Sequence, residues 1–160
     1  MDIFYTDGST LNNGNYGFQI SRICVTDGDG KLLIDHPIGD KTNIEAEAFA
    51  ILAALKRIKN NNIIKSQIRT DSNFWMKAIK FRWKLKQPRL FPVRDLLYSM
   101  TDETQAEIVW VPREMNPAGQ YLEANPTKKQ KDKKTPRKLS CPHCGKPIVI
   151  GYKRNDISVA

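Results

Sequence analysis

Three acidic side chains occupy positions from which they could share one site. Asp7 ends a strand-like stretch at residues 2–8. Asp71 follows a second such stretch at residues 63–70. If the two strands are neighbours in an open α/β sheet, both aspartates reach the edge at which such sheets bind ligands. Glu47 lies in the first turn of the helix expected between them and can face the same edge.

Carboxylates crowded in this way repel one another unless a cation joins them. A ligand set made only of oxygen suits Mg²⁺ or Mn²⁺. Two such ions about 3.5–4 Å apart promote in-line displacement at phosphorus, one by activating water and the other by stabilising the leaving oxygen. The spacing alone also fits structural roles, because Asp7-Gly8-Ser9 is an ordinary turn and Asp71-Ser72-Asn73 an ordinary helix start.

The apolar periodicity predicts the elements that hold these side chains. Strands are expected at residues 2–8, 16–25, 31–38, 63–70 and 106–112, and helices at residues 44–60, 73–86, 91–100 and after Asn116. Thr42 and Glu45 form a capping box at the start of the first helix. Short turns join the first three strands into an antiparallel meander, whereas helices join the last two, as parallel strands require. The expected order is therefore βββαβααβα, an α/β fold.

Four sequence blocks resemble the signature of the type 1 ribonuclease H family, in its order and spacing, over residues 2–124. They are Tyr5-Thr6-Asp7-Gly8-Ser9, Thr42-Asn43-Ile44-Glu45-Ala46-Glu47, Thr70-Asp71-Ser72 and Trp110-Val111-Pro112-Arg113-Glu114. The resemblance implies a five-stranded mixed sheet, three strands antiparallel and two parallel, flanked by helices. It also implies an endoribonuclease that hydrolyses the RNA strand of RNA–DNA hybrids and leaves 5′-phosphate and 3′-hydroxyl ends.

The resemblance further assigns roles to individual residues. Asp7, Glu47 and Asp71 become catalytic ligands of two Mg²⁺ ions, for which Mn²⁺ can substitute. Residues at the family's substrate-contacting positions are Gly8, Ser9, Thr42, Asn43 and Asn73. Among these, Asn43 and Asn73 resemble RNA-contacting residues that read 2′-hydroxyls, and Thr42 resembles a residue of a phosphate pocket.

The last helix departs from the family pattern. The family's fourth carboxylate is an Asp four residues after the Asn that corresponds to Asn116, and here Gln120 stands there. Glu123 follows one helical turn later, on the same face, and is expected to replace it as a catalytic metal ligand. The mobile histidine of many members is also absent from this region. Two alternatives stay open: a catalytically weak protein that only binds hybrid or double-stranded nucleic acid, and a related nuclease such as a junction resolvase.

The overall composition separates a domain from a basic tail. Residues 126–160 hold 10 Lys and Arg and 2 Asp, a charge of +8 out of the total of +9. We expect a ribonuclease H domain at residues 1–125, a flexible basic linker at 126–140 and a small cysteine-containing end at 141–160. Cys141 and Cys144 form half of a zinc knuckle, and a structural zinc site needs two more ligands.

Other features bear on where the protein resides. No stretch is long and apolar enough for a transmembrane helix, and the N-terminus has no signal-peptide pattern. The three cysteines are an odd number, and one of them, Cys24, lies in an apolar strand. This does not fit a disulfide framework, so we expect a reducing, cytoplasmic environment.

Deleting residues 127–160 tests the role of the tail. Because basic side chains release counterions from phosphates, we expect the truncated protein to cleave normally but to bind nucleic acid more weakly. The plot of log affinity against log salt concentration should become flatter. Identical affinities for both proteins across a salt series would show that the tail makes no contact with nucleic acid.

Overall fold

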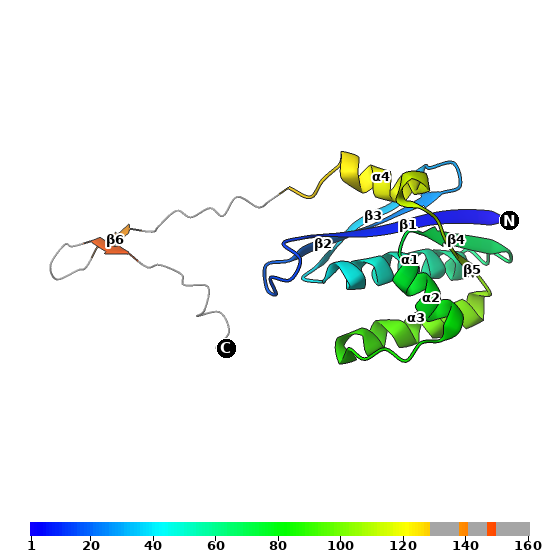
Figure 1. Cartoon of the computed structure of the whole chain (residues 1–160). Helices are drawn as coiled ribbons and strands as arrows, with labels where there is room; N and C mark the ends of the chain where they lie inside the picture. Colours follow the sequence, from blue (N-terminus) through cyan, green and yellow to red (C-terminus); the bar gives the residue numbers. More distant parts are fainter. Residues whose placement is uncertain (129–137, 141–146, 150–160) are drawn as a thin grey trace. The chain divides into compact units, whose positions relative to one another are not determined.

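The structure, a computed structural model, describes residues 1–128, 138–140 and 147–149 (Figure 1). The chain divides into two units, residues 1–128 and 129–160. The first is an α/β domain built on a five-stranded sheet in the order β3-β2-β1-β4-β5. In the second, Lys138–Ser140 (β6) pairs antiparallel with Pro147–Val149 (β7).

The five strands have the expected order and directions. Strands β1 (Asp2–Leu11), β2 (Ile20–Asp27) and β3 (Leu32–Gly39) form the antiparallel meander. Strand β4 (Ser66–Thr70) pairs parallel with β1, and β5 (Glu107–Trp110) pairs parallel with β4. The mixed five-stranded sheet predicted from the sequence is thus confirmed, with β1 at its centre.

The helices lie on both faces of this sheet. Figure 1 shows α1 (Asn43–Asn60), α2 (Asn73–Phe81) and α3 (Phe91–Thr104) on one side and α4 (Pro117–Ala124) on the other. Two short 3₁₀ helices, η1 (Pro88–Leu90) and η2 (Arg113–Met115), precede α3 and α4. The capping box at the start of α1 is present, because Thr42 Oγ1 accepts from the Glu45 amide and the Glu45 carboxylate accepts from the Thr42 amide.

Several element boundaries differ from the prediction: β1 runs on to Leu11 and α3 to Thr104, whereas β5 ends at Trp110. Strand β2 begins at Ile20 because residues 15–18 form a turn, in which Gly17 has a φ of +85° and donates its amide to Asp40. Strand β4 begins only at Ser66. Helix α2 ends at Phe81 because Arg82 adopts the left-handed conformation that terminates many helices. The apolar stripe continued past this point, so periodicity alone missed the stop.

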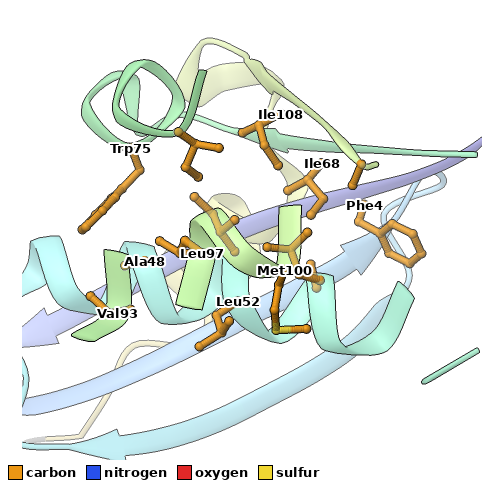
Figure 2. Close-up of a cluster of buried hydrophobic side chains, with 14 of the residues drawn as sticks. Phe4, Ala48, Leu52, Ile68, Trp75, Val93, Leu97, Met100 and Ile108 are labelled. Atoms are coloured by element: carbon orange, nitrogen blue, oxygen red, sulfur yellow. The ribbon is translucent and has the colours of Figure 1, made fainter. Parts of the chain in front are cut away.

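The main core fills the space between the sheet and helices α1–α3 (Figure 2). Side chains from the sheet, from α1 and from α3 meet there, among them Phe4, Ile68 and Ile108, Ala48 and Leu52, and Val93, Leu97 and Met100. Trp75 of α2 is fully buried in the same cluster and donates its indole N–H to the Ile44 carbonyl over 2.7 Å. This bond fixes α2 against the start of α1.

Helix α1 approaches β1 most closely at Gly8. A Cβ added there would lie 2.3 Å from the carbonyl carbon of Ala46 and 2.6 Å from the Glu47 amide nitrogen. Backbone atoms cannot yield as a flexible side chain can, so the position accepts only glycine. The close approach brings Asp7 and Glu47, the neighbours of these two residues, to the same part of the fold.

Gly8→Ala should therefore destabilise the domain strongly, by at least about 2 kcal/mol, as for an overpacked core. Gly28→Ala is the matched control, because its Cβ would meet only Ile3, at 3.4 Å from the Cβ atom and 3.8 Å from the carbonyl oxygen, which are ordinary contacts. Urea denaturation of the two variants beside the wild type measures the difference. Equal unfolding free energies for the two variants would contradict the proposed packing constraint.

Candidate active site

The two aspartates emerge from neighbouring parallel strands. Thr6 of β1 pairs with Thr70 of β4, and Asp7 and Asp71 follow directly after this pair. Glu47 comes from the first turns of α1, which packs on the same strands. The structure thus brings together the three carboxylates that the sequence placed at one sheet edge.

Asp7 is covered by the start of α4. Only 4% of the residue is exposed, and a Cβ at Gly119 would lie 3.2 Å from its Oδ2 atom. The side chain of fully buried Asn116 secures this arrangement, since its amide donates to the Thr6 carbonyl over 3.0 Å while its oxygen caps the Ala118 amide. Asn116, expected only as a helix cap, therefore also binds α4 to the central strand.

Glu47 is held by side chains at two helix starts. Ser72, the N-cap of α2, donates its hydroxyl to Glu47 Oε2 over 2.6 Å. Asn43 donates its side-chain amide to Oε1 over 3.3 Å. In the sequence, Ser72 is part of a helix start and of the Thr70-Asp71-Ser72 block, and its neighbour Asp71 is the one signal that it lies at the site.

Asp71 contacts a cation from the segment after β5. Arg113 Nη1 lies 3.3 Å from Asp71 Oδ2, and the Trp110 indole donates to the Asp71 carbonyl over 3.2 Å. Arg113 Nε in turn bonds Glu123 Oε1 over 2.8 Å. In the sequence, Arg113 stands out only by its place in the Trp110–Glu114 block. Its position between two acids could not be read from spacing.

Burial and the repulsion of neighbouring negative charges weaken the acidity of Asp7 and Glu47. Burial, followed by the negative charge of Asp71, raises the pKa of Asp7 to about 7, with Glu47 adding to the effect and Arg113 opposing it. Burial also raises the pKa of Glu47, against the hydrogen bond from Ser72. The site therefore lacks positive charge, and Arg113 compensates only in part.

Gln120 and Glu123, the two residues considered for the position of the family's fourth carboxylate, make different contacts. Gln120 is exposed, and its side chain donates to the Glu114 carbonyl over 2.7 Å. The Glu123 side chain is 59% exposed and bonds Arg113. Glu123 is thus connected to Asp71 through the guanidinium, and no hydrogen bond or ion pair in residues 1–128 joins it directly to the other three acids.

The predicted substrate-contacting residues surround Glu47. Thr42 and Asn43 stand at the start of α1 and exposed Asn73 begins α2, whereas Gly8 and Ser9 belong to β1. The Asn43 amide bonds the side chain of Asn13, which lies in the β1–β2 turn. One further cation adjoins this region: Arg89 bonds Glu45 Oε2 over 2.8 Å and stacks on the Tyr16 ring.

Two negative findings concern only the described part of the chain. There, no three His, Cys, Asp or Glu side chains, Asp7, Glu47 and Asp71 included, lie in an arrangement that could hold a metal ion. None of the helices in that part could cross a membrane. The proposed zinc residues Cys141 and Cys144 lie outside the described residues.

Comparisons with known proteins agree with this geometry. The RNase H family model matches residues 2–114. The RNase H1 of the archaeon Halobacterium salinarum NRC-1 is 27% identical, with a TM-score of 0.60, over 76% of this chain and 92% of that chain. LC11-RNase H1, whose crystal structure contains an RNA/DNA hybrid, is 26% identical, with a TM-score of 0.58, over 72% and 88%.

The RNase H domain of a Mycobacterium tuberculosis protein, 24% identical with a TM-score of 0.62 over 76% and 94% of the two chains, shares the fold. No match was found among curated proteins. The family match spans most of the first unit and includes all three carboxylates at the sheet edge. The chain belongs to the RNase H family.

Proposed function

We propose that this protein is an endoribonuclease that hydrolyses the RNA strand of RNA–DNA hybrids and leaves 5′-phosphate and 3′-hydroxyl ends. The observation that carries the proposal is the convergence of Asp7, Glu47 and Asp71 at one sheet edge of an RNase H family domain. A structural neighbour crystallised with an RNA/DNA hybrid supports the substrate class.

Magnesium ions fit this site by charge and by donor chemistry. The three side chains offer only oxygen ligands. The pKa of Asp7 is raised by burial and then by the negative charges of Asp71 and Glu47, and a bound cation would offset these charges. Asp7, Glu47 and Asp71 would hold two Mg²⁺ ions, or Mn²⁺ in their place. Bound there, the ions supply an activated water and stabilisation of the leaving oxygen.

The remaining residues position these ligands and the substrate. Ser72 and Asn43 fix the two oxygens of Glu47, while Asn116 and the side-chain-free Gly119 fix the surroundings of Asp7. For the substrate we propose contacts from Gly8, Ser9, Thr42, Asn43 and Asn73. The amide side chains can bond 2′-hydroxyls, which distinguish RNA from DNA.

A hybrid-binding protein with weak catalysis is the second candidate function. The observation favouring it is the amide at Gln120 in place of an acid, since Gln120 is bonded to the Glu114 carbonyl and carries no charge. Both candidate functions predict hybrid binding. They differ in whether bound hybrid is cut.

Cleavage of a labelled RNA–DNA hybrid in Mg²⁺ distinguishes the candidates. We expect the wild type to cut the hybrid and to leave double-stranded RNA, double-stranded DNA and a four-way junction intact. Binding without cutting would support the weak-catalysis candidate. Preferential cutting of the junction would identify a resolvase instead.

Two glutamates of α1 form a matched pair for the same assay. Glu47→Gln should abolish cleavage, because an amide cannot supply the charge that a metal ligand needs. Glu45→Gln should keep cleavage within a few-fold and lower the unfolding free energy by about 0.5–2 kcal/mol, since Glu45 completes the helix cap. An essential Glu45 beside a dispensable Glu47 would contradict the assigned roles.

Asp7 should also make stability depend on pH. Its pKa rises from 3.8 to about 7 in the folded protein, so folding favours the protonated acid. As the pH rises, Asp7 ionises in the unfolded state before it does so in the folded state, and this ionisation stabilises the unfolded state. The free energy of unfolding should therefore fall as the pH rises from about 4 to about 7 and then level off. Asp7→Asn removes this dependence.

At pH 7.5 without divalent ions, Asp7→Asn should be more stable than the wild type by about 1–3 kcal/mol, since a tenfold change in proton affinity is worth about 1.4 kcal/mol. The difference in unfolding free energy between the two proteins should be smaller at pH 4.5. Added Mg²⁺ should raise the melting temperature of the wild type and leave that of the variant unchanged. Parallel pH profiles for both proteins would refute the electrostatic account of the site.

A further inference from the structure

The face of α4 that carries Gln120 and Glu123 is bound to η2. The Gln120 side chain donates to the backbone carbonyl of Glu114, and the Glu123 carboxylate accepts from Arg113 Nε over 2.8 Å. These two contacts come from side chains one helical turn apart on α4. Together they tie down the short 3₁₀ helix that carries Arg113.

Arg113 in turn joins Glu123 to the carboxylate edge. Its guanidinium uses Nε for Glu123 and Nη1 for Asp71 Oδ2. A guanidinium carries five N–H groups in one plane, so two carboxylates on different atoms fix that plane. Within residues 1–128 the other N–H groups have no protein acceptor, and 58% of the side chain is exposed. A positively charged donor is thereby left open beside Asp71.

The surroundings of Glu123 do not favour it as a metal ligand. Its side chain is 59% exposed, and one of its carboxylate oxygens is already occupied by Arg113. Arg113 reaches Asp71 Oδ2 directly over 3.3 Å, whereas within residues 1–128 no hydrogen bond or ion pair joins Glu123 to Asp7, Glu47 or Asp71.

We propose that Glu123 is a positioning residue for Arg113, and that Arg113 binds a phosphate of the substrate strand next to the three carboxylates. This proposal rests on the proposed function. A fork of N–H donors matches the geometry of phosphate oxygens. In this chain, α4 would therefore contribute a residue that positions the Arg113 guanidinium, whereas the family pattern has a metal-binding carboxylate in this helix.

Mg²⁺ binding to the free protein separates this role from metal ligation. Titration followed by nuclear magnetic resonance should give Glu123→Gln the affinity of the wild type, within about twofold, while Asp7→Asn loses binding. The exposed ion pair contributes little to folding, so Glu123→Gln should remain folded. Asp7→Asn should also remain folded, because it keeps the shape of the buried side chain and removes its charge. A Mg²⁺ affinity at least tenfold weaker in Glu123→Gln would identify Glu123 as a ligand and overturn the proposal.

A double-mutant cycle tests the dependence on Arg113. Arg113→Ala should lower the affinity for hybrid in EDTA and lower kcat/KM in Mg²⁺ at least tenfold, and reduce the slope of log affinity against log salt by about one. Glu123→Gln should cause a smaller loss in the wild-type background and none in Arg113→Ala. Glu123→Asp should restore part of the loss. Equal effects of Glu123→Gln in both backgrounds would overturn the proposal.

Glu103→Gln is the matched control, because it removes another exposed ion pair, with Lys59, far from the site. It should change neither Mg²⁺ affinity nor hybrid affinity. The measurements of Mg²⁺ binding to the free protein and of hybrid binding in EDTA do not depend on cleavage. If the wild type binds hybrid without cutting it, the proposed activity fails while these measurements still decide the role of Glu123.

Discussion

The contact between the α1 backbone and β1 at Gly8 is the constraint on which the site depends. Without a side chain at Gly8, the helix lies near enough to the central strand to bring Glu47 to the edge where Asp7 and Asp71 emerge. The large core beneath, with four fully buried alanines on α1, keeps the helix at that distance. The folding energy of this core holds like charges together against their repulsion.

Different polar groups around the site offset the repulsion among the three carboxylates. The acids have different partners: Glu47 receives a hydroxyl and an amide, Asp71 a guanidinium, and Asp7 the Gly8 amide together with the charge of Arg113. Asp7, the most buried of the three, therefore has the strongly raised pKa. Such a perturbed group in an otherwise well-paired domain is typical of a functional site rather than of a structural ion pair.

The sequence predicted the element order, the capping box and the three carboxylates, because these follow from periodicity, local hydrogen bonding and the resemblance. It placed the start of β2 too early and the end of α2 too late, since Gly17 and Arg82 change the backbone locally. The partners of Glu47 and Asp71 could not be predicted. Ser72 and Arg113 reach them through tertiary contacts between segments 25 and 42 residues apart. For Glu123, helical register placed the residue on the same face of α4 as Gln120 but could not predict its contact with Arg113.

Helix α4 is attached more lightly than the helices on the opposite face. Its apolar contacts are a small separate cluster that includes Cys24, Ala118 and Leu122, supplemented by the buried Asn116 amide. Segments with few buried contacts open locally at a lower free energy than the whole domain. Opening α4 would hydrate Asp7 and let it ionise, so amide hydrogen exchange in α4 should accelerate with pH beyond its chemical rate. In this domain the protonation of Asp7 and the local opening of α4 would therefore be thermodynamically linked.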